Sequence, residues 1–155
     1  MYDRIKSFVM KKFIFVMLAF LSLGTLAVKA DKDYVITINR LPAKARQFVK
    51  SHFAAVKVSY IKEERDFFKR NYEILFADGS KVEFAGNGDW VEVDCRFSEV
   101  PRSVVPAAIT AYVQEHFPDV TVRKIERERG GYDVKLSNKL ELFFDKSLKL
   151  WNIDD

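Results

Sequence analysis

The hydrophobic and polar positions of this chain repeat with two different spacings, and the helical spacing is the easier to see. Apolar residues recur at helical intervals after Pro42 and again after Pro106. Proline suits the first turn of a helix, because its missing N–H has no intrahelical partner to lose there. The two predicted helices carry the stripes Ala45, Phe48, Val49, His52 and Phe53, and Ile109, Tyr112, Val113, His116 and Phe117.

Strict alternation of apolar and polar residues follows each helix and predicts strands. The alternating segments are residues 56–60, 72–77, 81–84 and 90–94, and then 120–122, 132–136, 142–144 and 151–153. Asp78-Gly79, Asn87-Gly88 and Gly130-Gly131 are typical hairpin turns between them. Ile61 and Ile125 are out of phase with the residues just before them, which predicts a β-bulge near each.

The two halves of the chain match each other over residues 41–94 and 105–154. The matching positions include Leu41-Pro42-Ala43 with Val105-Pro106-Ala107, His52-Phe53 with His116-Phe117, Tyr72 with Tyr132, and Asp94 with Asp154. The sequence therefore predicts an α+β fold. We expect a tandem repeat of one helix plus a four-stranded antiparallel sheet, giving one curved sheet of about eight strands with both helices on one face.

The first thirty residues have the features of a secretory signal peptide. Lys11-Lys12 precede an almost wholly apolar run, residues 13–23, and Val28-Lys29-Ala30 offers small residues for cleavage. The run is shorter than the ~20 residues of a membrane span; the alternative is a retained membrane anchor. We expect a signal peptide at 1–30, with a natural start at Met10, and one domain of two repeats at 31–155. The expected location is the periplasm.

Removing the leader changes the charge of the protein. The whole chain has 26 Lys and Arg against 22 Asp and Glu, but residues 1–30 hold five of the former and one of the latter, which leaves 21 of each. A nucleic-acid partner would require a basic excess, so none is expected. Membrane binding after cleavage is not expected either. Cys95 is the only cysteine, so it is either an inert thiol or a link between two chains.

Few residues suggest catalysis, and we expect no enzyme, no cofactor and no metal. His52 and His116 occupy equivalent helix ends, where a ring nitrogen can meet free carbonyls; the alternatives are a metal ligand or a pH switch. The acids Glu63-Glu64, Glu126 and Glu128 alternate with basic residues, as in a solvated hairpin.

A resemblance emerges from the order of these features. The leader, the Leu-Pro helix start, the His-Phe helix end, the Tyr-x-apolar strand, the Asp-Gly turn and the closing Val-Asp of residues 93–94 together resemble the PepSY-like family of exported Bacteroidetes proteins. That family is similar in fold to the beta-lactamase-inhibitor protein. The resemblance implies a role as an inhibitor or chaperone-like partner of another periplasmic protein or peptide, without assigning an inhibitory residue.

The candidate site is the sheet face that carries no helix. With Tyr72, Ile74 and Phe76 facing the helix, the opposite face would carry apolar groups among charges, a pattern typical of binding surfaces. The expected partner-binding residues are Trp90, Leu75, Phe143, Leu150 and Glu73, together with Phe67 and Phe68 at an exposed hairpin tip. Two alternatives stay open. These side chains could pack on each other across strands, and the protein could instead be a small-ligand or metal-binding sensor or carrier. The oligomeric state is unknown.

Overall fold

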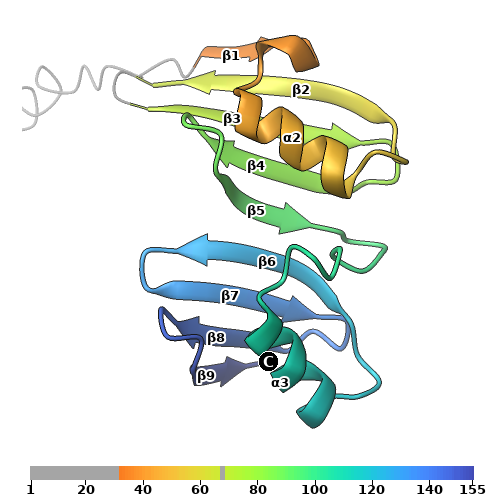
Figure 1. The fold of residues 1–155 in the computed structure, drawn as a ribbon, viewed down its shortest axis with the longest axis vertical. Helices are drawn as coiled ribbons and strands as arrows, with labels where there is room; N and C mark the ends of the chain where they lie inside the picture. Colours follow the sequence, from red (N-terminus) through yellow and green to blue (C-terminus); the bar gives the residue numbers. More distant parts are fainter. Residues whose placement is uncertain (1–31, 67–68) are drawn as a thin grey trace, which may run out of the picture. The chain divides into compact units, whose positions relative to one another are not determined.

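The computed structural model describes residues 32–66 and 69–155, which form one antiparallel sheet with two α-helices on one face (Figure 1). The strands are β1 (Lys32–Val35), β2 (Val58–Arg65), β3 (Arg70–Phe76), β4 (Lys81–Ala85), β5 (Trp90–Asp94), β6 (Val122–Glu128), β7 (Gly131–Leu136), β8 (Glu141–Asp145) and β9 (Leu150–Asp154). The helices are η1 (Ile38–Arg40, a 3-10 helix), α2 (Ala43–His52) and α3 (Ala107–His116). Each strand pairs with the next along the chain.

The prediction of two helix-plus-four-strand units forming about eight strands is wrong, although the α+β class is consistent with the structure. The sheet has nine strands, because β1 pairs antiparallel with β2 ahead of the first helix. The backbone N–H of Ile36 then donates to the carbonyl of Ile61 at 2.9 Å, which continues this pairing. A four-residue strand with no equivalent before the second helix leaves too short a pattern to be recognised from alternation.

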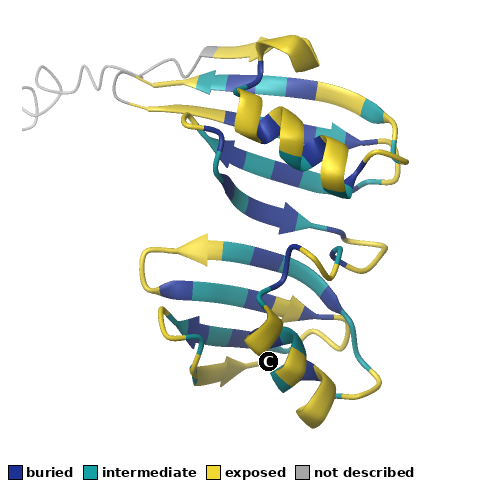
Figure 2. Ribbon diagram, in the orientation of Figure 1, coloured by how far each residue is buried: buried dark blue, intermediate teal, exposed yellow. Residues whose placement is uncertain are grey.

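Both helices begin directly after a proline and bury one stripe against the sheet. Pro42 and Pro106 lie one residue before the helices, and their carbonyls accept the first helical hydrogen bonds, from Arg46 and Thr110 at 3.0 Å. Ala45 and Ile109 are fully buried, as expected for the predicted stripes. Figure 2 shows buried and exposed segments alternating along each helix, as a single buried stripe requires.

The core lies between the helices and the sheet. The ring of Phe53, just after α2, stacks on Phe76 of β3 at 4.7 Å between centroids, and Tyr112 of α3 meets Phe144 of β8 edge-on at 5.7 Å. Ile74 of β3 has no exposed surface. Burying each side chain of this size stabilises the fold by about 1.5–3 kcal/mol, before the cost of ordering the chain.

Four irregularities in the pairing decide which side chains face the helices. The predicted bulge near Ile61 is confirmed, between Val58 and Tyr60, and a second lies between Val122 and Lys124, near Ile125. Two further bulges, in β5 and β9, are not predicted by the alternation. A bulge places two residues opposite one, and therefore changes the face on which later side chains lie.

Candidate binding face

The sheet face opposite the helices, here called the helix-free face, carries a row of carboxylates that crosses five adjacent strands. Each acid in the row is paired directly with the next across the sheet: Glu73, Glu83, Glu92, Glu126 and Asp133 on β3 to β7. Neighbouring strands are about 4.8 Å apart. Like charges placed directly opposite each other destabilise a sheet, so this carboxylate row reduces the stability of the fold unless other charges compensate it.

Lysines beside the row neutralise most of it. Lys81 lies 3.0 Å from Glu92 and 2.7 Å from Glu83, and Lys124 lies 2.8 Å from Glu92 and 3.1 Å from Glu126. Each of these lysines bridges two acids on neighbouring strands. Lys62 is the closest cation to Glu73, at 4.0 Å, but it lies only 2.6 Å from Glu64. The compensation is therefore strongest in the middle of the row.

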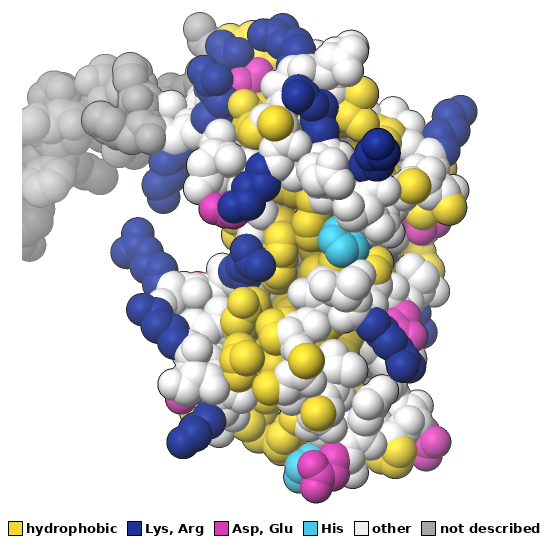
Figure 3. All heavy atoms as spheres, in the orientation of Figure 1, with side chains coloured by type: hydrophobic (Ala, Val, Ile, Leu, Met, Phe, Trp, Pro, Cys, Tyr) yellow, Lys and Arg dark blue, Asp and Glu magenta, His cyan; other side chains and the backbone are white. Residues whose placement is uncertain are grey.

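The helix-free face as a whole is strongly acidic. Its lysines are Lys62, Lys81, Lys124 and Lys135. Arg96 and Arg123 border it, in a recess that they share with Asp94, Lys124 and Lys135. Its acids are Asp33, Glu64, Glu73, Glu83, Glu92, Asp94, Glu126, Glu128, Asp133, Glu141, Asp145 and Asp154. Since residues 31–155 hold equal numbers of acids and bases, the opposite side is basic, and Figure 3 shows Lys and Arg outnumbering Asp and Glu there.

Glu92 occupies the centre of the row and is 8% exposed. Burial alone would raise the pKa of this carboxyl, but hydrogen bonds from Lys124 and Lys81 outweigh burial and lower the pKa. The two lysines therefore stabilise the carboxylate more than desolvation disfavours it. Burial likewise opposes the charge of Lys81, and its contacts with Glu83 and Glu92 raise its pKa.

We expect Glu92→Gln to destabilise the protein at neutral pH by about 1–2 kcal/mol, because Lys81 and Lys124 lose a charged acceptor. A carboxyl with a depressed pKa in the folded state contributes stability above its unfolded pKa of about 4.3 and loses it as pH falls through the folded value. The difference from wild type should therefore shrink below about pH 4. Urea unfolding at pH 7 and at pH 3 measures it. Glu128→Gln, at an exposed acid, is the control; equal losses in both variants would contradict the prediction.

Asp133 ends the row in a different environment. Among the described residues, no hydrogen bond or ion pair joins its carboxylate to a cation, and its partner on β8 is Phe143. Burial raises the pKa of Asp133, and so do Glu128, Glu126 and Glu141. A recess of about 80 Å³ lies here, lined by Lys124, Glu126, Asp133, Val134, Lys135 and Glu141. Asp133 is thus the acid of the row that is least compensated.

Two aromatic rings adjoin this end of the row. Phe143 follows Asp133 across the sheet, and Trp151 of β9 lies 5.7 Å from it between ring centroids. Trp151 is 68% exposed, which is unusual for a side chain of this size. The uncompensated acid therefore lies beside half-buried Phe143, and exposed Trp151 lies next to that ring on the helix-free face.

The structure brings together some of the predicted binding residues and separates others. Glu73, Leu75 and Phe143 lie on the helix-free face as expected. Placing Trp90 and Leu150 on that face is wrong. They pair with Phe84 and Phe144, two buried residues of the helix side, because the unpredicted bulges of β5 and β9 shift them there. The remaining two predictions, Phe67 and Phe68, lie outside the described residues.

Trp90 instead belongs to an aromatic group on the helix side. Its ring lies 6.2 Å from Phe48 of α2 and 6.5 Å from Tyr132 of β7, and the guanidinium of Arg127 sits 3.8 Å above it. Trp90 is only 8% exposed. Figure 3 shows hydrophobic side chains gathered between the two helices in this region. Trp90 therefore contributes to packing within the domain.

Pattern analysis missed Trp151 and the carboxylate row. Alternation along the last strand places Trp151 on the inward face with Ile153, whereas the bulge of β9 places it against Phe143. The row depends on the register of five strands, and acids far apart in the chain become neighbours only when that register is known. The sequence does show acids between the apolar positions of several expected strands, and this pattern could have indicated an acidic sheet face.

The two histidines, Cys95 and Glu63 make contacts within the fold. His52 Nδ1 is 2.9 Å from Ser103 Oγ, and His116 Nδ1 is 3.0 Å from the carbonyl of Tyr112. Cys95 is buried, and burial raises the pKa of its thiol, which makes the thiolate rare. Glu63 is not solvated as expected: it is 3% exposed and accepts two hydrogen bonds from Arg65 at 2.9 Å.

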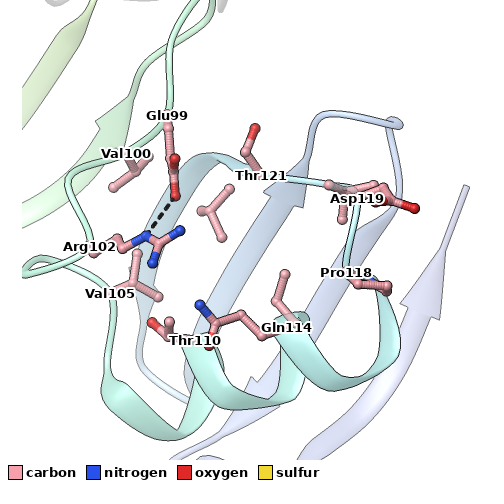
Figure 4. Close-up of a pocket in the computed structure, with 12 residues that line it drawn as sticks. Glu99, Val100, Arg102, Val105, Thr110, Gln114, Pro118, Asp119 and Thr121 are labelled. Atoms are coloured by element: carbon pink, nitrogen blue, oxygen red, sulfur yellow. Dashed lines mark hydrogen bonds and ion pairs between the residues drawn. The ribbon is translucent and has the colours of Figure 1, made fainter.

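A cavity of about 240 Å³ lies away from this face, between α3, the start of β6 and the segment before α3 (Figure 4). Val105, Val113 and Val122 contribute apolar surface, and Arg102 and Gln114 contribute polar groups. Arg102 donates a long hydrogen bond, 3.4 Å, to Glu99 (Figure 4). The cavity suits a small molecule with one apolar and one polar end.

In residues 32–66 and 69–155, no three or more His, Cys, Asp or Glu side chains are grouped so that they could hold a metal ion. Nor does any helix in that part of the chain combine the length and hydropathy that a membrane span requires.

Solved structures from Bacteroides are similar to this chain. A structure described as a putative periplasmic protein of Bacteroides vulgatus is 44% identical, covers 81% of this chain and 99% of its own, and has a TM-score of 0.78. One described as a putative calcium-regulated periplasmic protein of Bacteroides thetaiotaomicron is 46% identical, with 79% and 97% coverage and a TM-score of 0.77. A second Bacteroides vulgatus protein, described as a putative periplasmic protein of unknown function, is 38% identical, with 80% and 100% coverage and a TM-score of 0.75.

These likenesses agree on location and assign no enzymatic activity. All three structures are described as periplasmic, and this chain is a periplasmic protein. A search of curated proteins finds no match to it. The family described as "putative beta-lactamase-inhibitor-like, PepSY-like" matches residues 70–152, more than half of the chain, which confirms the resemblance noted in the sequence. The chain therefore belongs to the PepSY-like family.

Proposed function

We propose that this protein works without enzymatic chemistry, by binding a periplasmic protein or peptide through its helix-free face. The observation that carries the proposal is the carboxylate row with Phe143 and Trp151 beside it, on a face that no described helix covers. Exposed aromatic groups among charges are typical of interaction surfaces. Inhibition of the partner, or chaperone-like protection of it, are the two forms of this function that the family resemblance suggests.

The arrangement of the acids supports binding over catalysis. General acid–base chemistry needs carboxyl groups that converge on one substrate in a cleft. The central acids of this row are instead spread along an open sheet surface, and Lys81 and Lys124 hold Glu83, Glu92 and Glu126. Charges held in this way set the electrostatic complementarity of a surface, which governs partner choice and the rate of encounter.

A capture experiment tests the proposal. The immobilised wild type is compared with a Phe143→Ala, Trp151→Ala double variant in native periplasmic extract, with bound proteins identified by mass spectrometry. We expect the double variant to lose the specific partner while it still folds. Tyr34→Ala is the control, because Tyr34 is 42% exposed but pairs with Glu63, whose partner on β3, Tyr72, faces the helices. Identical capture by the wild type and the folded double variant would contradict the proposal.

A small-ligand or metal-binding carrier is the second candidate, and the valine-lined cavity beside Arg102 favours its small-ligand form. The calcium in the description of the Bacteroides thetaiotaomicron relative makes Ca²⁺ one ion to test. A small carboxylic acid that raises the melting temperature of the wild type but not of Arg102→Gln would support this candidate. A melting temperature unchanged by such acids and by Ca²⁺ would count against it.

A further inference from the structure

The helix-free face has a charge distribution that narrows the choice of partner. Its lysines are outnumbered by its acids, and the middle of the row is nevertheless well compensated by Lys81 and Lys124. Near β7, Lys124 pairs with Glu126, and Lys135 lies 2.6 Å from Glu141. Asp133 and Glu128, in contrast, have no ion pair with a cation among the described residues, and Glu126, Glu128 and Glu141 all raise the pKa of Asp133. The β7 end of the row therefore carries uncompensated negative charge.

We propose that the partner presents a cationic segment, a lysine or arginine beside an apolar residue, and that this segment docks at the β7–β9 end of the helix-free face. This inference rests on the proposed function and names its partner class. The cation would enter the recess at Asp133, and the apolar residue would lie on Phe143 and Trp151. The carboxylate of Asp133 matches an ammonium or guanidinium group, which has donors and no acceptor. The two lysines that also line the recess, Lys124 and Lys135, are already paired with Glu92, Glu126 and Glu141.

The size and the rim of the recess fit this occupant. Its volume of about 80 Å³ exceeds the ~30 Å³ that one water molecule occupies in the liquid, which leaves room for a charged head group. The long apolar stems of lysine and arginine pack well on aromatic surface while their charged ends reach polar groups. Phe143, which pairs with Asp133 across the sheet, and Trp151 next to it supply that surface.

The unfavourable charge of Asp133 is a further reason to expect a cationic partner. A carboxylate held among other carboxylates and partly buried disfavours folding at neutral pH, since its raised pKa means that the charged form is less stable in the folded state. A cation from a partner would remove that penalty. The proposal therefore makes an unusual prediction: Asp133→Asn should make the free protein more stable and the complex weaker.

Peptide binding tests the proposal directly. The probes are a short lysine-leucine peptide with blocked ends, the same peptide with every lysine acetylated, and its glutamate counterpart. Trp151 is one of two tryptophans, and the other, Trp90, is buried, so fluorescence of a Trp90→Phe variant reports on Trp151 alone. We expect only the lysine peptide to bind, with an affinity that falls as salt is raised. Equal binding of the acetylated peptide would overturn the proposal.

Matched variants locate the site. We expect Asp133→Asn and Trp151→Ala each to weaken lysine-peptide binding by about tenfold, measured by calorimetry with each variant otherwise unmutated. Asp33→Asn is the control, since it removes the same charge from the same face at the opposite edge, on β1. An equal loss in Asp33→Asn would mean diffuse attraction and would overturn a site at Asp133. Asp133→Asn should also raise the urea midpoint, and an unchanged or lower midpoint would contradict the electrostatic argument.

Failure of this inference can be told apart from failure of the proposed function. If the Phe143→Ala, Trp151→Ala double variant loses its periplasmic partner while Asp133→Asn retains it, the face binds a partner that is not cationic. The inference is then wrong and the proposed function stands. If the double variant captures the same proteins as wild type and the lysine peptide does not bind, both are wrong.

Discussion

Replacing Gly131 with alanine is expected to destabilise the protein by about 3 kcal/mol or more, because there is no room for a side chain at this position. Gly131 begins β7 and pairs with Asp145 of β8. A Cβ built on it would overlap the carbonyl oxygen of Phe144, and would lie 2.7 Å from the carbonyl carbon of Asp145. Both neighbours are backbone atoms of the sheet, so neither can move without breaking the pairing of β7 with β8.

The backbone conformation adds to this cost. Gly131 has a φ of 150°, in the range that residues with a side chain rarely adopt. Steric overlap and strain therefore act in the same direction. Equilibrium unfolding in urea, followed by far-ultraviolet circular dichroism, measures the loss as a lower midpoint with an unchanged slope.

Gly130→Ala is the matched control for that measurement. Gly130 is the adjacent residue of the same turn, and a Cβ added to it meets nothing within 4 Å. Its φ is not in the positive range. The change should therefore be neutral, or stabilising by up to about 1 kcal/mol through the reduced entropy of the unfolded chain. If the two variants lost equal stability, the close approach of β7 and β8 at Gly131 would be wrong.

At this glycine pair, the sequence predicts the turn but not which glycine is required. The Gly-Gly pair predicts a hairpin turn at residues 130–131, and β6 and β7 are indeed joined there. The sequence alone does not tell which of the two glycines has room for a side chain and which has none. That difference arises from the approach of β8, a contact between segments separated in the chain, which local turn propensity cannot contain.

The bulges set a similar limit on predicting the candidate site. Alternation correctly places Leu75 and Phe143 on the helix-free face, and the broken phase at Ile61 correctly predicts a bulge. It places Trp90 on the wrong face, because the bulge of β5 falls within the strand without disturbing the apolar spacing that a reader sees. One extra residue inverts the assignment of every side chain beyond it.

Substituting alanine at two adjacent phenylalanines, positions 143 and 144, is expected to separate an effect on stability from an effect on binding. The loss of stability in Phe144→Ala should be large. Phe144 faces the helices and is 1% exposed, with the ring of Tyr112 edge-on at 5.7 Å. Phe144→Ala removes a fully buried ring and leaves a cavity beneath α3. We expect a loss of about 3–5 kcal/mol in the free energy of unfolding, which is a large share of the 5–15 kcal/mol that is typical of a domain.

Phe143→Ala changes the same residue type one position earlier, on the opposite face of the same strand. Its ring is half-buried and meets Trp151, so its removal should cost about 1 kcal/mol of folding free energy. Urea unfolding of both variants measures the difference, and lysine-peptide affinity is measured for each variant that remains folded. Phe143→Ala should lose binding and retain most of its stability, while Phe144→Ala should lose stability and, while folded, still bind. The opposite pattern would mean that β8 presents its faces the other way round, and the binding face would then lie beneath the helices.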